Sequence, residues 1–479
     1  MITLTAQDIA DVTSGQLRCD PATEVFSGVT TDSREVSAGY LFVAKPGETT
    51  DGHHFIPKAL DSGATLVLCE REVQVNGKVV PSIIVKDVIL AMGLIAAEIV
   101  KRLRTHNNMK VVAITGSAGK TTTKDLLNAI FSQVGPTVAP QGSYNSEVGV
   151  PLTVFKCTEE TQYLVVEMGA DAIGNIRYLC NMVHPDVGVV LIVGTAHAGG
   201  FGGADKIAIA KGEMVEDLGP DQIAVLNADD AQVAAMKNRT KAPICWFSSQ
   251  DKELDNVVVA RNVKIDDFSY PHCDLIFPDG SSQHIDGHLM GEHHVTNMLA
   301  AAAAAYSIGI NTKDIAQALN TKQDMSKWRM QRDESPAGFT VINDAYNANP
   351  ESMKAALQTL AKVGQGRRTW AVLGEMLELG DDVIEQHDSI GRQVVRLNIS
   401  KLLVVGQGAK AIFNAAHLEG SWGNEAYFAE DFAEAKKILL QELLPDDVVL
   451  FKSSNGSKLG YLGEEILELP PSDFKNMQE

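Results

Sequence analysis

The stretch VVAITGSAGKTTTKDLLNAI, residues 111–130, constrains the fold of this chain more than any other part of its sequence. An apolar run typical of a strand ends in a glycine-rich turn, and the lysine and threonines that follow open an amphipathic helical segment. Such a turn presents backbone N–H groups and a helix N-terminus to phosphate oxygens. The string therefore predicts a phosphate-binding loop (P-loop), although a plain strand-to-helix turn is the alternative.

The P-loop string predicts which residues bind the nucleotide and what two of them do. Lys120 is expected to neutralise the β- and γ-phosphates of ATP or GTP, and the Thr121 hydroxyl to bind Mg²⁺. Only two residues separate the first glycine from the Gly-Lys pair, whereas the usual pattern has four. The predicted nucleotide-binding residues of this loop are Gly116, Ser117, Ala118, Gly119, Lys120, Thr121 and Thr122.

A chain of 479 residues exceeds what one hydrophobic core holds, and domain sizes suggest roughly three units. The polar stretches KRLRTHNNMK and NTKQDMSKWRM read as joints, which predicts domains at residues 1–107, 108–325 and 326–479. In the second domain, strand-like runs such as VVAITG, YLVVEMG and IAVLN alternate with helical segments. This alternation predicts an α/β fold with a mostly parallel sheet, and the third domain repeats it.

Charge and composition exclude several classes of protein. The formal net charge of −20 opposes non-specific binding of nucleic acid, which needs a basic surface. The six cysteines are scattered without a CxxC pair, so neither a zinc site nor a disulfide framework is indicated. No apolar run approaches the ~20 residues that span a bilayer, and the N-terminus lacks the pattern of a signal peptide. We expect a cytoplasmic protein, a monomer, without membrane insertion.

The short P-loop resembles that of the Mur ligases and their folylpolyglutamate synthase relatives. Further strings carry this resemblance over nearly the whole chain: TTDSREVSAGYLFVAKPG, YLVVEMGA, GEHHVTNMLAA and DAYNANP. The last, Asp344 to Pro350, resembles the members that join D-Ala-D-Ala to a UDP-N-acetylmuramoyl-tripeptide. The string FKSSNGS departs from the usual KGSR-like string, and His294 stands where Asn is usual.

The resemblance implies a three-domain α/β enzyme in which a UDP-binding domain and a Rossmann-like domain flank the central P-loop ATPase domain. It implies UDP-substrate contacts by Thr31, Asp32, Ser33, Arg34, Lys45 and Asn145. It adds Asn297, Arg329 and Asp344 to the ATP site, and Tyr346, Asn347 and Asn349 to the D-Ala-D-Ala side. The implied catalytic residues are Lys120, Lys211, His197 and Arg329.

The resemblance also implies a metal site with the ligands Thr121, Glu167, His197 and Lys211, the lysine being carried as a carbamate that gives Mg²⁺ an oxygen ligand. Glu167 ends an apolar strand, where a buried carboxylate needs a partner. Without the resemblance, Lys211 reads as a solvated helix lysine and His197 as a structural histidine.

The activity that the resemblance implies is ATP-dependent amide ligation through an acyl phosphate. One alternative is another Mur-type or folylpolyglutamate-type ligase, and a second is an ATP-dependent switch without ligation activity. A further alternative is an NAD-dependent enzyme, because Gly406, Gly408 and Ala411 follow a strand and Glu430 lies ~20 residues beyond.

Overall fold

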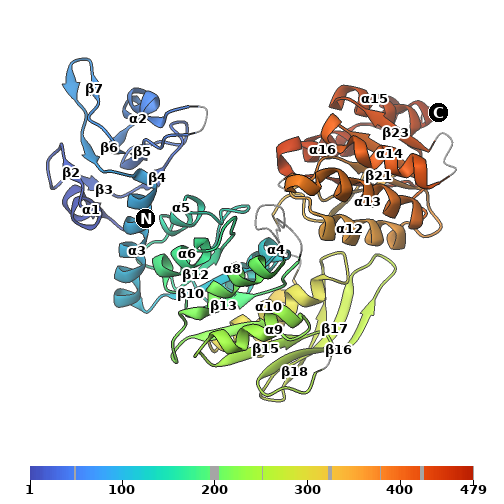
Figure 1. Cartoon of the computed structure of the whole chain (residues 1–479), viewed down its shortest axis with the longest axis horizontal. Helices are drawn as coiled ribbons and strands as arrows, with labels where there is room; N and C mark the ends of the chain where they lie inside the picture. The colour runs from blue at the N-terminus through green and yellow to red at the C-terminus, as the bar shows by residue number, and fades with distance from the viewer. Residues whose placement is uncertain are drawn as a thin grey trace.

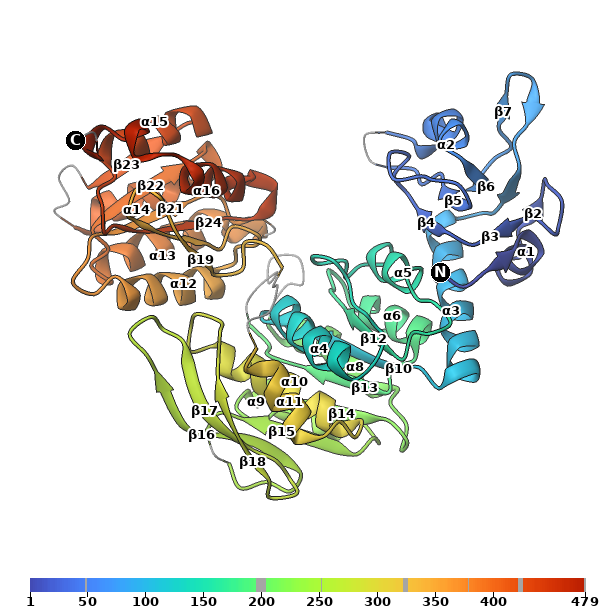
Figure 2. The same cartoon turned by 180° about the vertical axis from the view of Figure 1, so that it is seen from behind.

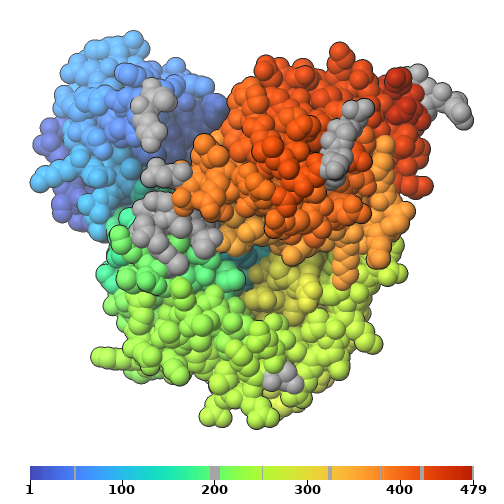
Figure 3. All heavy atoms as spheres, turned by 45° about the vertical axis from the view of Figure 1, so that its right-hand side comes forward, coloured from blue at the N-terminus to red at the C-terminus, as the bar shows by residue number. Residues whose placement is uncertain are grey.

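The computed structural model describes residues 1–47, 50–194, 204–250, 252–321, 326–377, 379–420 and 425–477. Within these ranges, three large sheets follow one another along the chain, each covered by helices (Figure 1). The predicted three-domain α/β architecture is confirmed. The N-terminal and C-terminal domains lie on the same side of the central domain (Figure 3).

The N-terminal sheet has five strands in the order β2-β9-β6-β5-β4. Its strands β4, β5, β6 and β9 run parallel, and β2 is antiparallel to β9. The strands are β2 (Gln16–Leu17), β4 (Gly28–Thr30), β5 (Tyr40–Val43), β6 (Ala64–Cys69) and β9 (Ser82–Ile84). The helices are α1 (Ala6–Thr13), α2 (Ile56–Asp61) and α3 (Val88–Asn107), and the short strands β1 (Leu4–Thr5), β3 (Glu24–Val25), β7 (Gln74–Val75) and β8 (Lys78–Val79) form two ribbons.

The central sheet has nine strands in the order β11-β12-β10-β13-β14-β15-β16-β17-β18. The parallel part comprises β10 (Lys110–Thr115), β11 (Thr137–Val138), β12 (Tyr163–Glu167), β13 (Val187–Val190), β14 (Ile223–Asn227), β15 (Ile244–Ser248) and β16 (Val257–Ile265). Strands β17 (Pro271–Ile276) and β18 (Ser282–Asp286) extend it in antiparallel fashion. This extension was not predicted, because its alternating polar pattern suits any half-exposed strand.

Helices cover both faces of the central sheet. One face carries α4 (Lys120–Val134), α10 (His294–Ser307) and α11 (Thr312–Leu319), seen from outside in Figure 2. The other face carries α5 (Gly149–Val154), α6 (Asn175–Val183), α8 (Ala204–Glu216) and α9 (Ala231–Ala235). Six consecutive alanines, 300–305, let α10 approach the sheet closely, and all six are fully buried.

The C-terminal sheet has six strands in the order β19-β20-β24-β21-β22-β23, and all but β19 run parallel. The strands are β19 (Gln331–Glu334), β20 (Thr340–Asn343), β21 (Thr369–Leu373), β22 (Lys401–Val405), β23 (Ala426–Ala429) and β24 (Val448–Lys452). Its helices are α12 (Pro350–Val363), α13 (Val383–Arg396), α14 (Lys410–Glu419), α15 (Phe432–Glu442) and α16 (Leu459–Glu468). No helix among the described residues is long and apolar enough to cross a membrane.

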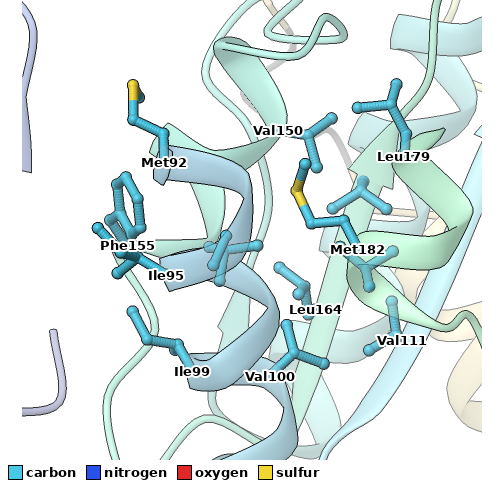
Figure 4. Close-up of a cluster of buried hydrophobic side chains, with 14 of the residues drawn as sticks. Met92, Ile95, Ile99, Val100, Val111, Val150, Phe155, Leu164, Leu179 and Met182 are labelled. Carbon is cyan, nitrogen blue, oxygen red and sulfur yellow. The ribbon is translucent and has the colours of Figure 1, made fainter. Parts of the chain in front are cut away.

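Helix α3 joins the cores of the first two domains. It ends the N-terminal domain, yet Met92, Ile95 and Ile99 lie in one continuous cluster with Phe155 and Met182 of the central domain (Figure 4). The same cluster reaches into the N-terminal sheet. The domain boundary predicted near residue 107 therefore separates two segments that share one hydrophobic core.

Replacing Ile99 by Ala tests this shared core. The side chain is fully buried, so Ile99→Ala should lower the free energy of unfolding by about 2–5 kcal/mol. Ile384, which is 73% exposed on α13, supplies the matched control, because Ile384→Ala should change it by less than about 0.5 kcal/mol. Scanning calorimetry of both variants measures the difference; equal unfolding temperatures would contradict the shared core.

Candidate active site

A cavity of about 830 Å³ opens where the three domains meet. The N-terminal domain contributes the start of α3, the central domain the P-loop and α10, and the C-terminal domain the loops after β20 and β24. The residues that line it range from Asp87 to Gly456, so the fold brings distant parts of the chain together. Most predicted site residues line it: Ser117, Ala118, Gly119, Lys120, Thr121, Thr122, Asn145, Glu167, Lys211, Asn297, Arg329, Asp344, Tyr346, Asn347 and Asn349.

The P-loop packs against α10. Gly119 has φ +81°, in the left-handed region that favours glycine, and a Cβ there would lie 2.3 Å from Oδ1 of Asn297. Lys120 begins α4 and donates from Nζ to the Gly116 carbonyl at 2.8 Å. Ser117 is tied to the segment after β13, because its N–H donates to the Ile192 carbonyl at 2.8 Å. The loop is therefore held in shape by both of its neighbours.

The Thr121 hydroxyl lies at the centre of a cluster of oxygen atoms. It donates to Oε2 of Glu167 at 2.9 Å and lies 3.1 Å from Oγ of Ser143. Glu167 is buried at the carboxyl end of β12, and its Oε1 accepts from Nδ2 of Asn145 at 2.9 Å. Hydroxyl and carboxylate oxygens are the ligands that Mg²⁺ prefers, so this group fits the predicted metal.

Lys211 lies on α8, is 4% exposed and lines the same cavity. Burial, with a smaller contribution from the positive charge of Lys120, lowers the pKa of Lys211 to about 7. A substantial fraction of the amine is therefore neutral near pH 7. His197, the remaining predicted metal ligand, lies outside the described residues. Among the residues that the structure describes, no three His, Cys, Asp or Glu side chains form a metal-binding group by themselves.

Arg329 follows the linker into the C-terminal domain and returns to the P-loop. Its Nη2 donates to Oγ of Thr121 at 3.0 Å and to Oγ of Ser143 at 3.3 Å. The guanidinium lies 4.5 Å from the centre of the Tyr346 ring, a cation–π contact. Earlier in the linker, the Ser326 N–H donates to Oδ2 of Asp125 on α4 at 3.0 Å. The linker is thus attached to the P-loop helix on both sides of residue 327.

Asp344 and Lys452 form a buried ion pair at the edge of the cavity. Nζ of Lys452 donates to Oδ2 of Asp344 at 2.5 Å and to the Asn347 carbonyl at 3.1 Å. Oδ1 of Asp344 accepts from the Met330 N–H at 3.1 Å. Burial lowers the pKa of Lys452, opposed by the Asp344 charge. The pair fixes the turn that carries Tyr346 and Asn347.

At the start of α10, Nδ1 of His294 accepts from Nδ2 of Asn297 at 3.1 Å. Nδ1 is therefore unprotonated in the neutral ring, and the proton lies on Nε2, which is buried without a hydrogen-bond partner among the described residues. Burial holds the pKa of His294 well below its usual value. The histidine that replaces the usual asparagine is accordingly neutral.

The predicted UDP-binding residues lie apart from this cavity, except Asn145. Thr31, Asp32, Ser33 and Arg34 follow β4, and Lys45 follows β5. Because β4 and β5 are adjacent and parallel, both loops lie at one edge of the N-terminal sheet. Nη2 of Arg34 donates to Oδ2 of Asp32 at 2.5 Å. The loop is therefore an ordered turn, and its contact with UDP stays a prediction.

The side of the cavity predicted for D-Ala-D-Ala is lined by amide and hydroxyl groups. Tyr346, Asn347 and Asn349 lie there with Ser454 and Asn455 of the divergent FKSSNGS string. Asn349 also caps α12, accepting from the Ser352 N–H at 2.8 Å.

The glycines of the competing dinucleotide pattern serve a different purpose. A Cβ at Gly408 would lie 2.3 Å from Cδ of Glu375, so a carboxylate lies against the glycine that a pyrophosphate would approach. Glu430 accepts from Nε2 of Gln407 at 3.3 Å. The negative charge of Glu375 beside Gly408 disfavours NAD, and the pattern is explained as a strand-to-helix turn.

Two residues of the site were not identified from the sequence. Ser143 contacts both Thr121 and Arg329, but the resemblance singled out Asn145 and not Ser143 in this loop. Lys452 ends the apolar strand β24, and the rule that singled out Glu167 at the end of β12 could have found it.

Comparisons with known proteins agree with this geometry. The Mur ligase middle domain matches residues 114–305, the Mur ligase glutamate ligase domain residues 328–455, and the Mur ligase family catalytic domain residues 25–114. The UDP-N-acetylmuramoyl-tripeptide--D-alanyl-D-alanine ligase of Mycobacterium tuberculosis (strain ATCC 25618 / H37Rv) is 40% identical, over 98% of each chain.

Solved structures agree as well. A crystal structure of MurF from Acinetobacter baumannii has a TM-score of 0.84 at 32% identity, covering 97% of this chain and 99% of that one. MurF from Thermotoga maritima in complex with ADP has a TM-score of 0.74 at 26% identity, covering 92% and 96%. With matching domains along most of its length, the chain belongs to the Mur ligase family.

Proposed function

We propose that this chain joins D-Ala-D-Ala to a UDP-N-acetylmuramoyl-tripeptide, using ATP and Mg²⁺. The observation that carries the proposal is the cavity in which the P-loop, Arg329 and the DAYNANP turn meet. The full-length similarity to ligases of this name supports the choice of substrates. All three domains of one chain line the cavity, which supports a monomer as the active unit.

The chemistry requires activation of a carboxylate. A peptide carboxylate does not react with an amine near neutral pH, so transfer of the γ-phosphoryl group of ATP first converts it into an acyl phosphate. The amine of D-Ala-D-Ala then attacks the acyl carbon, an amide bond forms, and inorganic phosphate leaves. ADP is the nucleotide product. Because the reaction consumes ATP, we infer that it takes place in the cytoplasm, as a step of peptidoglycan precursor synthesis.

Different residues of the site have different roles in the proposed reaction. Lys120 and Arg329 supply positive charge where the phosphoryl group transfers, which is the main catalytic requirement of such reactions. Thr121 and Glu167 offer oxygen ligands for Mg²⁺, which when bound neutralises phosphate charge. Tyr346 holds the Arg329 guanidinium from the C-terminal domain and accepts through its hydroxyl from the Ser143 N–H at 2.9 Å.

Lys211 completes the proposed metal site as a carbamate. Its neutral amine attacks CO₂, an N–C bond forms, and one proton is released, which leaves a negatively charged oxygen ligand. Burial and the lowered pKa favour the neutral amine that this step requires. A permanent ammonium at this position would instead repel the metal.

The substrate assignment is tested by product analysis. Phosphate release from ATP should require both the UDP-muramoyl-tripeptide and D-Ala-D-Ala, and the nucleotide product should be ADP. The assay couples phosphate detection to chromatography of the nucleotides. Formation of AMP, or full activity with a single amino acid in place of the dipeptide, would contradict the proposal. Hydrolysis without any peptide acceptor would indicate an ATP-dependent switch.

The carbamate is tested by replacing Lys211. Lys211→Ala should lower kcat by at least roughly 100-fold, because loss of a metal ligand exceeds the loss seen for outer-shell partners. Acetate or formate, diffusing into the vacated space, should restore part of the activity, while the circular dichroism spectrum stays unchanged. Rescue by methylamine but by neither carboxylate would show that the residue acts through its positive charge.

The pH dependence follows from the lowered pKa of Lys211. At pH values below about 7 the amine is protonated and cannot react with CO₂. Enzyme incubated at pH 6 without bicarbonate should therefore lose activity and regain it at pH 8 when bicarbonate is added. Assays at one fixed pH after each incubation measure the effect. Full activity after the acidic incubation would be evidence against the carbamate.

A further inference from the structure

Glu213 is a carboxylate that the proposed reaction does not use, and it is fully buried. It lies on α8, two residues beyond Lys211. Successive residues of a helix point about 100° apart, so Lys211 and Glu213 face in nearly opposite directions. The first lines the cavity, and the second faces α6. A buried charge needs partners, which makes the surroundings of Glu213 informative.

The partners of Glu213 are backbone amides at the start of α6. Oε1 accepts from the Gly174 N–H at 2.6 Å, and Oε2 from the Arg177 N–H at 3.1 Å. Gly174 is the N-cap residue and offers no side chain for this purpose. The carboxylate of α8 thus replaces the missing cap of α6, where the helix dipole also favours a negative charge.

The start of α6 in turn holds the loop that follows Glu167. Oδ1 of Asn175 accepts from the N–H groups of Asp171 and Ala172, at 3.1 and 2.8 Å. These contacts form a short path from Glu167, through the loop and α6, to Glu213 on α8. Lys211 is carried by the same helix, so the path connects two of the proposed metal ligands, Glu167 and Lys211.

A third side of α8, between those of Lys211 and Glu213, is held as well. Arg239 donates from Nη1 to the Ala208 carbonyl at 2.9 Å and from Nη2 to the Ile209 carbonyl at 2.8 Å. The guanidinium approaches so closely because position 212 is glycine, where a Cβ would lie 1.9 Å from Nη1. In the string KGE, Lys211 faces the cavity, Gly212 admits Arg239, and Glu213 caps α6.

We propose that Glu213 is a positioning residue for Lys211, which fixes that lysine relative to Glu167 so that both can bind one metal. The proposal rests on the metal role proposed above for Lys211. Glu213 contacts neither ligand directly but holds the elements that carry them; loss of groups that orient metal ligands costs roughly 10–100-fold in metal affinity or activity. Glutamine at position 213 keeps the shape but presents an NH₂ group to one of the two backbone N–H donors.

The test uses the full chain with Glu213→Gln. The Mg²⁺ concentration for half-maximal turnover should rise by roughly 10-fold or more. With [¹³C]bicarbonate, the NMR signal of the lysine carbamate should weaken, which is a readout independent of turnover. An unchanged Mg²⁺ requirement together with an unchanged carbamate signal would overturn the proposal.

Asp447→Asn is the matched control for lost stability. Asp447 is also a buried carboxylate that accepts from a backbone amide, the Leu444 N–H at 2.9 Å, and it additionally pairs with Arg368 at 2.7 Å. It lies in the C-terminal domain away from the cavity. This variant should lower Tm while leaving the Mg²⁺ requirement within about twofold, because distant sites act independently. If both variants raised the requirement equally, Glu213 would have only a structural role.

Two more variants keep the outcomes distinct. If Glu213→Gln fails to fold, Glu213→Asp is tested in its place. Aspartate retains the charge but is one methylene shorter, so it should hold α6 less well. A normal Mg²⁺ requirement of Glu213→Asp would refute the proposal. Lys211→Ala separates the two levels of inference. Full activity of Lys211→Ala would overturn the metal role itself, whereas an inactive Lys211→Ala beside a normal Glu213→Gln would overturn only the role of Glu213.

Discussion

The hydroxyl of Thr121 lies within hydrogen-bond distance of groups from three separate parts of the chain: Glu167, Ser143 and Arg329. The remaining site is arranged around this cluster. The sheet places Glu167 at the end of β12, α4 presents the hydroxyl, and the linker brings in the guanidinium. Thr121 and Glu167 are buried, so their polar groups need these neighbours, and Arg329 of the linker supplies one of them.

Arg329 is a positive charge at the cavity that contacts residues of two domains. Contacts of Ser326 and Arg329 attach the linker to the central domain, while Trp328 donates from Nε1 to Oε1 of Glu464 in the C-terminal domain at 3.1 Å. Trp328 therefore contacts the C-terminal domain, whereas its neighbour Arg329 donates hydrogen bonds to the central domain. A rotation of the C-terminal domain would act first on Trp328 and Tyr346, and only through them on the arginine.

The P-loop, the parallel sheets and the position of Glu167 could be predicted from local patterns, whereas most other cavity residues were predicted only from the resemblance to the Mur ligases. Gly119 and Lys120 stand in a fixed order, and Glu167 ends an apolar strand. No local sequence pattern of this kind identifies the antiparallel strands β17 and β18. Ser143 and Glu213 owe their roles to partners far along the chain, such as Arg329 and Gly174, which no local pattern reveals.

Helix α3 has a consequence for how this chain can be divided. Its buried side chains belong to a core that extends through the N-terminal and central domains, and Ile89 and Leu90 in its first turn line the cavity. A fragment that began after residue 107 would expose the apolar groups of α5 and α6 that α3 covers, and such surfaces promote aggregation. An expressible ATP-binding fragment should therefore retain α3. The remaining N-terminal fragment would then lack α3, the helix that completes its core.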